Sequence, residues 1–360
     1  MRAELGLVAL VLAAACGDAP TGPTAPVRVD LSRGWLHASP GDMGMSASTL
    51  RGAAGDAAGI PRFKSLLVAR HGRLVAEYYF GGSDSTTLFD VRSVTKSVVC
   101  ALTGIALRDG VLPGTAAPIA RYLAPADTFD SGDSAVTVRH VLTMTSGYAW
   151  DETTGPDYNA WILAANHVQY LLDRAHASPP GATFTYNSAA VHMLGVVLED
   201  AAATPLPRYA TDHLLGALGV DTVTWEPLDR GTVNGGSGMA PRARDLLKFG
   251  QLFLQRGWSG DASVVPESWV DSVTRPQFAW RTVVGPLQQV TYGMLWWVSD
   301  ASPAAYFAWG YGGQFVYVVP SRDLVAVATT DWAVLSEITP TELAAQVLGV
   351  IVNDVVPAAR

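Results

Sequence analysis

Ser93 and Lys96 form the tetrad Ser93-Val94-Thr95-Lys96, at the point where the spacing of apolar residues becomes helical. Because positions i and i+3 share one face of a helix, the hydroxyl and the amine can hydrogen-bond. A serine hydroxyl is a poor nucleophile until a neighbouring base removes its proton, and a neutral lysine can be that base. The tetrad therefore indicates nucleophilic catalysis, with Ser93 attacking and Lys96 accepting the proton.

This role requires an unusual lysine. Its pKa must fall from about 10.4 towards about 7–8, which burial and positive neighbours can achieve. The N-terminal end of a helix dipole also disfavours a cation. Only three lysines occur in the chain, Lys64, Lys96 and Lys248. A lysine in the first turn of a helix is locally unfavourable, and such conflicts tend to mark functional sites.

Further segments follow the tetrad in a definite order along the chain. The five segments are Asp90–Ser97, Thr137–Gly147, Pro180–Ser188, Gly235–Gly250 and Trp309–Gln314. Together they resemble the serine β-lactamase and penicillin-binding-protein superfamily. The resemblance is strongest to its class C-like branch, which includes carboxylesterases and 6-aminohexanoate-oligomer hydrolases, and it covers roughly residues 40–350.

The resemblance implies roles for residues beyond the tetrad. In the superfamily, the tyrosine of the Tyr-x-Asn/Ser element contacts the nucleophile and passes protons to the leaving group, which assigns this role to Tyr186. Ser188 stands in the third position of that element and is implied as a substrate-binding group. Acyl transfer also needs two backbone N–H groups that stabilise an oxyanion. The resemblance implies the N–H of Ser93 and one near Gly310–Gly313, of which we favour Gly312.

Trp309 occupies the place where penicillin-binding relatives carry a Lys-Thr-Gly or His-x-Gly strand. That strand puts a cation against the carboxylate of the substrate, whereas no Lys, Arg or His occurs here between Val298 and Pro320. Burying a carboxylate without a paired donor is costly. Trp309 is therefore predicted to favour neutral esters or amides, unless an arginine from elsewhere, such as Arg281, supplies the charge.

These residues together predict a serine hydrolase that acts through an acyl-enzyme on a small-molecule ester, amide or peptide. No metal or organic cofactor is implied, and the seven dispersed histidines form no metal-binding pattern. The alternatives are a peptidoglycan D-Ala-D-Ala carboxypeptidase or β-lactamase, and a catalytically idle penicillin-recognising binding module. An idle module would be expected to have lost Ser93, Lys96 or Tyr186, and all three are present.

The elements that must position these residues follow from hydrophobic periodicity. Strands are predicted near 66–69, 74–80, 306–309, 314–319 and 324–330, and helices over 93–107, 138–144, 159–174, 187–201, 242–256 and 341–355. Strands at both ends around a helical middle predict an α+β, β-lactamase/transpeptidase-like fold, an antiparallel sheet flanked by helices with an inserted, mostly helical domain. The hydrolase domain is predicted to span 31–360, with its sheet part at about 31–90 and 280–360 and its helical part at about 91–279.

Composition excludes other classes of protein. Of the 360 residues, 49% are hydrophobic and 16% are charged, against a usual charged share of about 25%, which excludes a disordered chain. The net charge of −8 leaves no basic surface for nucleic acid. Of the two cysteines, Cys16 and Cys100, the second is predicted to be a buried core thiol.

The N-terminus has the pattern of a secretory signal. Arg2 precedes an apolar run, Leu5–Ala15, that is too short to span a bilayer and ends in small residues before Cys16. Leu12–Cys16 resembles the lipobox of bacterial lipoproteins, in which the cysteine is acylated; the alternative is an ordinary cleaved signal. We therefore expect a signal peptide over 1–15, a lipidated tether over 16–30, and an extracytoplasmic lipoprotein that meets the membrane only through this lipid.

Replacing the lipidation site tests this expectation. In a bacterial host, the wild-type protein should need detergent for extraction, because a diacylated cysteine supplies the two chains that stable anchoring requires. Cys16→Ser should release the protein into the soluble extracytoplasmic fraction or stall its processing. Quantitative recovery of the wild-type protein without detergent would argue against lipidation.

Overall fold

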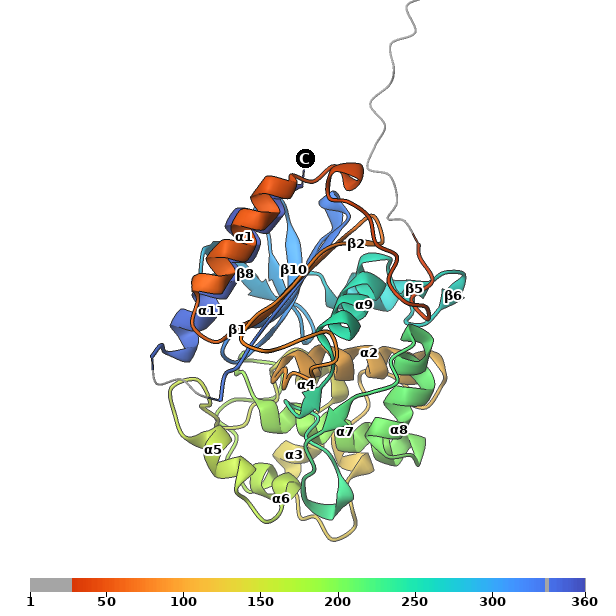
Figure 1. Ribbon diagram of the computed structural model, residues 1–360. Helices are drawn as coiled ribbons and strands as arrows, with labels where there is room; N and C mark the ends of the chain where they lie inside the picture. The colour runs from red at the N-terminus through yellow and green to blue at the C-terminus, as the bar shows by residue number, and fades with distance from the viewer. Residues whose placement is uncertain (1–27, 334–336, 360) are drawn as a thin grey trace, which may run out of the picture.

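The computed structural model describes residues 28–333 and 337–359, so Cys16 and the predicted signal lie outside the described part. An eight-stranded antiparallel sheet has the order β2-β1-β12-β11-β10-β9-β8-β7 (Figure 1). Its strands are β1 (Phe63–Arg70), β2 (Arg73–Tyr79), β7 (Thr282–Val284), β8 (Leu287–Tyr292), β9 (Trp297–Ser299), β10 (Ala305–Gly310), β11 (Gln314–Val319) and β12 (Leu324–Thr330). The sheet thus joins the two ends of the chain, as the predicted α+β architecture requires.

Helices make up most of the other regular secondary structure in the described residues. They are α1 (Ala47–Gly59), α2 (Val94–Arg108), α3 (Ser131–Ala135), α4 (Val138–Leu142), α5 (Asp157–Ile162), α6 (His167–Leu172), α7 (Ser188–Ala202), α8 (Leu206–Ala210), α9 (Ala243–Leu254), α10 (Glu267–Val273), α11 (Pro340–Gly349) and α12 (Val356–Ala358). Two small hairpins pair β3 (Thr224–Trp225) with β4 (Met239–Ala240), and β5 (Trp258–Ser259) with β6 (Ala262–Ser263).

The two faces of the sheet carry different helices. Alternate side chains of a strand point to opposite faces. On β12, Val325 and Val327 join the core that contains α2 and α9, whereas Leu324 and Ala326 join the core of α1 and α11. Figure 1 shows α1 and α11 together on one side of the sheet and α9 on the other. Because β11 and β12 are covered on both faces, they are almost continuously apolar.

One helical run in the described part, Pro340–Ala358, is long and apolar enough to cross a membrane, and the bent pair formed by α7 and Leu206–Leu218 passes the same test as one span. Half of the most apolar window of Pro340–Ala358 is buried within the protein. Its residues Leu343, Val347 and Ile351 belong to the core on the face of the sheet that α1 and α11 cover. The run has the properties of a core helix.

The helix predicted over 159–174 is wrong as a single element. The structure contains two short helices, α5 and α6, because the side chain of Asn166 accepts a hydrogen bond from Gln169 N and so begins a new helix. The indole of Trp161 also donates to the carbonyl oxygen of His167 across the break.

The close contact of α9 with the sheet generates a stability prediction. A Cβ atom on Gly250 would lie 2.5 Å from Val325 Cγ1 and 2.7 Å from Val316 Cγ1. Overpacking of this kind costs about 1–3 kcal/mol, which outweighs the helix propensity that alanine gains. Gly250→Ala should therefore lower the melting temperature. Gly55→Ala in α1, where a Cβ meets nothing within 4 Å, is the matched control and should raise it. A Gly250→Ala protein as stable as the wild type would contradict this packing.

Candidate active site

Ser93 lies immediately before α2, and two buried contacts fix the helix behind it. The Ser97 hydroxyl donates to Leu295 O at 2.7 Å, and the Cys100 thiol donates to Met294 O at 3.1 Å. Both acceptors follow β8, so α2 is tied to the sheet side of the molecule. Cys100 is fully buried, which confirms its prediction as a core thiol, and burial raises its pKa well above the ordinary value.

The amine of Lys96 lies at the centre of a buried hydrogen-bond cluster. Its Nζ is 2.8 Å from Ser93 Oγ, the contact that the i, i+3 spacing predicts, 2.7 Å from Ser188 Oγ and 2.7 Å from Gly236 O. Lys96 is only 1% exposed, whereas Ser93 is half-buried. The arrangement places a buried amine directly beside the hydroxyl of a half-buried serine.

Burial changes the acidity of this amine. Loss of hydration lowers the pKa of Lys96 from 10.5 to about 7; the negative charge of Glu152 opposes this change, and the positive charge of Arg92 adds to it. A substantial fraction of Lys96 is therefore neutral near pH 7 and carries a lone pair. This is the property that a lysine base requires.

Tyr186 stands beside the same pair of residues. Lys96 Nζ lies 4.9 Å from the centroid of its ring. Burial raises the pKa of the Tyr186 phenol above its ordinary value, the charge of Glu152 adds to the increase, and a hydrogen bond with Ser93 opposes it. The phenol is therefore protonated at neutral pH. It is suited to relaying a proton rather than to starting the reaction as a phenolate.

The segment that carries Tyr186 is attached to the neighbouring motif through its backbone. Thr185 N donates to Met144 O at 2.7 Å, and Asn187 N lies 3.4 Å from Met144 Sδ. The side chain of Asn187 accepts from Ala190 N and caps α7, as the predicted helix start requires. Two of the five motifs thus meet at Met144, which explains how they position one tyrosine.

The β10–β11 hairpin carries the predicted oxyanion and substrate residues. At its start, a Cβ on Gly310 would lie 2.2 Å from Val91 O, so β10 ends against the segment that leads to Ser93. Gly312 has a φ of 74°, which favours glycine, and its carbonyl oxygen accepts from Thr330 Oγ1 at 2.7 Å. Trp309 is half-buried and stacks on Phe315, and the centroid of its ring lies 5.4 Å from that of Trp297. The roles of Gly312 and Trp309 stay predictions.

Glu152 is a residue of the site that the sequence analysis did not identify. Its Oε1 accepts from Ser188 Oγ at 2.6 Å, and its Oε2 accepts from Ser188 N at 2.6 Å and from Trp150 Nε1 at 2.8 Å. Ser188, predicted as a substrate-binding group, therefore lies between Lys96 and a carboxylate. An acidic residue two positions after Trp150 has no distinctive local pattern, so only the fold reveals this contact.

Two arginines bear on the charge of the site. Arg281, the alternative source of a cation, pairs with Asp300. Arg92, directly before the nucleophile, donates to Tyr158 OH at 2.8 Å and lies over the ring of Trp332, with Cζ 4.3 Å from the centroid. Its side chain is 13% exposed. Both guanidinium groups are thus engaged with protein groups.

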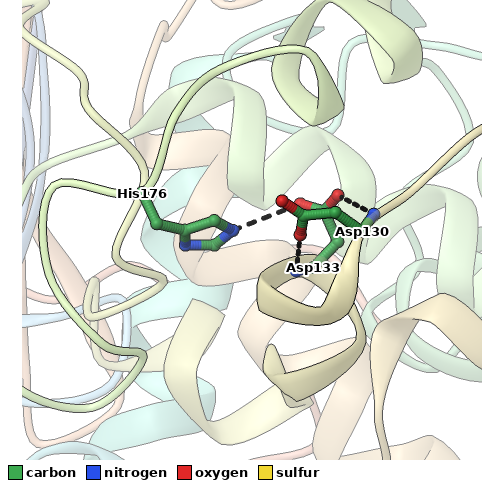
Figure 2. A group of neighbouring side chains, drawn as sticks. All are labelled: Asp130, Asp133 and His176. Carbon is green, nitrogen blue, oxygen red and sulfur yellow. Dashed lines mark hydrogen bonds and ion pairs between the residues drawn. The ribbon is translucent and has the colours of Figure 1, made fainter.

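A separate group of side chains has the composition of a metal site but is accounted for by helix capping. Figure 2 shows His176 directed at the carboxylates of Asp130 and Asp133, whose candidate ligand atoms all lie within 4.8 Å of one another. Asp130 and Asp133 form the capping box of α3. His176 Nε2 and Tyr148 OH contact Asp133 Oδ1 at 3.2 and 2.9 Å. His140 has a similar role, because its Nδ1 accepts from Thr137 N at the start of α4.

Comparisons with known proteins agree with the fold. The Beta-lactamase family model matches residues 48–348. The 6-aminohexanoate-dimer hydrolase of Paenarthrobacter ureafaciens is 24% identical over 290 residues, which cover 74% of this chain and 72% of that protein.

Solved structures show the same architecture. A proposed 6-aminohexanoate-dimer hydrolase from Bacillus anthracis has a TM-score of 0.72 at 18% identity and covers 92% of this chain and 89% of that one. EstCE1, a hydrolase with promiscuous acyltransferase activity, has a TM-score of 0.68 at 18% identity, and the match covers 87% of this chain and 99% of that one.

The fold and the site together define a serine hydrolase with the β-lactamase/transpeptidase-like architecture. The chain belongs to the β-lactamase family, as the resemblance of its five motifs predicted.

The acidity of Lys96 generates a pH prediction. Below about pH 7 the amine is protonated and its lone pair is unavailable, so kcat/KM should fall about tenfold per pH unit on the acid side and level off above pH 7. The measurement is kcat/KM from pH 5 to 9 with two esters that differ in their acyl chains. Because the limb belongs to the free enzyme, both esters should give the same midpoint. A flat profile would contradict a lysine base.

Proposed function

We propose that this chain hydrolyses esters or amides of small molecules through an acyl-enzyme, with Ser93 as nucleophile, Lys96 as base and Tyr186 as proton relay. The observation that carries the proposal is the 2.8 Å contact between Ser93 Oγ and the buried amine of Lys96. Burial keeps part of that amine neutral near pH 7, so it can take the serine proton.

Acylation follows from this arrangement. Ser93 Oγ bonds to the substrate carbonyl carbon while its proton moves to Lys96 Nζ. The resulting oxyanion is stabilised by the N–H of Ser93 and one from the β10–β11 hairpin, which we assign to Gly312. The bond to the leaving group then breaks, and that group receives the proton from Lys96 through the Tyr186 hydroxyl.

Deacylation reverses these roles. A water molecule gives its proton to the same relay and attacks the acyl carbon, and the Ser93 oxygen leaves and regains a proton from Lys96. The products are a carboxylic acid and the free enzyme, so the balance needs no cofactor.

Neutral substrates fit the surroundings of the nucleophile best. Tyr186 stacks with Trp297, and Trp297 lies against Trp309, so one side of the site is aromatic. Arg281, the cation considered for a substrate carboxylate, is paired with Asp300. The names of the relatives agree with amide hydrolysis and acyl transfer, since one is a 6-aminohexanoate-dimer hydrolase and another is a hydrolase with promiscuous acyltransferase activity. We also propose that a lipid on Cys16 holds the enzyme at the cell envelope, on the sequence pattern of residues 1–16 alone.

Intact-protein mass spectrometry tests the mechanism. With p-nitrophenyl butyrate, the wild type should release p-nitrophenol and carry a butyryl group on Ser93, and turnover of a chromogenic cephalosporin should be slow or negligible. Ser93→Ala and Lys96→Ala should each remove nearly all hydrolysis, and the double variant should be scarcely worse, because the two residues act as a unit.

Three results would contradict the proposal in different ways. Retained turnover in Ser93→Ala would exclude the nucleophile. Efficient cephalosporin hydrolysis with inert esters would favour a β-lactamase or a carboxypeptidase. A wild type that neither turns over nor becomes acylated by any member of a panel of activated esters, amides and β-lactams would favour a binding module.

A further inference from the structure

We propose that Glu152 is a positioning residue that sets the direction of proton transfer between Ser93 and Lys96, acting through the hydroxyl of Ser188. This inference rests on the proposed function, because it concerns the step in which Ser93 loses its proton. It adds a residue that belongs to none of the five motifs.

The proposal starts from the position of the Glu152 carboxylate at the beginning of a helix. Ser188 is the first residue of α7, and its N–H donates to Glu152 Oε2 at 2.6 Å. The N-terminal end of a helix of 15 residues favours a negative charge. The indole N–H of Trp150 donates to the same oxygen at 2.8 Å. With two donors on Oε2, the carboxylate is held as an acceptor.

The other carboxylate oxygen fixes the hydrogen of Ser188. A serine hydroxyl has one hydrogen to donate, and Ser188 Oγ donates it to Glu152 Oε1 at 2.6 Å. Ser188 Oγ therefore presents only lone pairs to Lys96 Nζ, 2.7 Å away. Ser188 is only 1% exposed, so water has little access to its hydroxyl and cannot readily replace Glu152 as the acceptor of its hydrogen.

The valence of the neutral amine then determines where its lone pair points. Neutral Lys96 has two N–H bonds and one lone pair, and three neighbours surround its Nζ. The carbonyl oxygen of Gly236 is an acceptor, and Glu152 makes Ser188 Oγ an acceptor as well. The two N–H bonds are used by these groups, so the lone pair is left for the Ser93 hydroxyl hydrogen. After transfer, the ammonium has three hydrogens for the same three neighbours.

Glu152→Gln tests this assignment with an almost isosteric change. The amide oxygen should stay where two N–H groups donate to it, which turns the amide NH₂ towards Ser188 Oγ. The amide then donates to Ser188, and the Ser188 hydrogen turns to the lone pair of Lys96 and competes with Ser93. The burst-phase acylation rate at saturating p-nitrophenyl butyrate should fall about 10- to 100-fold, with the apparent dissociation constant of the ester unchanged.

The pH profile gives a readout that a purely structural role would not move. The other charged or titratable groups that interact with Lys96 or Glu152 are Arg92 before α2, Tyr186 before α7 and Tyr292 on β8, and Cys100 on α2 interacts with Tyr292. Burial raises the pKa of Cys100 and of both tyrosines, and arginine stays charged, so Lys96 is the group of this set that titrates between pH 5 and 9. Glu152 raises the pKa of Lys96. Removing this charge in Glu152→Gln should lower the pKa of Lys96. The acid limb of the kcat/KM profile should therefore move to lower pH, while its plateau value should be smaller than in the wild type.

Ser188→Ala supplies the second arm. It removes the group through which Glu152 acts, so its acylation rate should also fall about 10- to 100-fold, and adding Glu152→Gln should lower the plateau no further. Glu199→Gln is the matched control, because the Glu199 carboxylate, on α7 itself, also accepts a hydrogen bond from a backbone N–H, that of Leu206. Glu199→Gln should leave both the acylation rate and the acid limb of the pH profile unchanged.

The outcomes separate this proposal from the one on which it rests. A wild type without a burst and without acylated Ser93 refutes the proposed function. If the wild type shows a normal burst and Glu152→Gln has the same acylation rate and the same acid-limb midpoint, only the role of Glu152 is refuted. Additive losses of acylation rate in the double variant would refute that role as well. If Glu152→Gln does not fold, Ser188→Ala decides: a wild-type acylation rate overturns the proposal, and the predicted loss supports it.

Discussion

The site depends on one constraint, which is the burial of the Lys96 amine. Removing an ammonium from water is costly unless hydrogen bonds replace its hydration. Here three acceptors surround Nζ, and they come from segments far apart in the chain: Ser93 before α2, Ser188 at the start of α7, and Gly236 before β4. The same burial lowers the pKa of the amine to about 7, so the cluster that joins these helical segments also gives Lys96 the acidity that its proposed role as base requires.

Hydrogen bonds and close backbone contacts hold these three segments in place. Thr95 Oγ1 accepts from Met239 N at 3.1 Å, which joins α2 to β4, and a Cβ on Gly236 would lie 2.4 Å from Ser188 O. The loop before β4 is therefore packed directly on the start of α7. On the opposite side, Ser97 and Cys100 bind backbone oxygens that follow β8. Close backbone packing thus surrounds the amine, and little freedom remains for its acceptors.

Local patterns predicted the parts of this structure whose causes are local. The β1–β2 turn lies between the strands predicted near 66–69 and 74–80, and α2 ends at Arg108, one residue beyond its predicted end. Asn187, the first residue of the helix predicted over 187–201, caps α7. The break between α5 and α6 was missed because its cause is a side-chain cap within an otherwise helical pattern. Glu152 was missed for a different reason. Its partner Ser188 lies 36 residues further along the chain, and no periodicity within either segment reports a contact between them.

The three lysines show why burial alone does not make a base. Lys64 is partly exposed, and its amine donates to Gly81 O. Lys248 is buried on α9, and burial lowers its pKa as well, but its Nζ donates to Leu218 O, and the charges with the largest effect on it are those of Asp245 and Arg242. A carbonyl oxygen has no proton to give, so this second buried amine only joins α9 to the 3-10 helix Gly216–Leu218. Lys96 differs in its neighbour rather than in its burial, because one of its three partners is a hydroxyl that can lose a proton. The proposed chemistry depends on that hydroxyl, and the fold places the amine within hydrogen-bond distance of it.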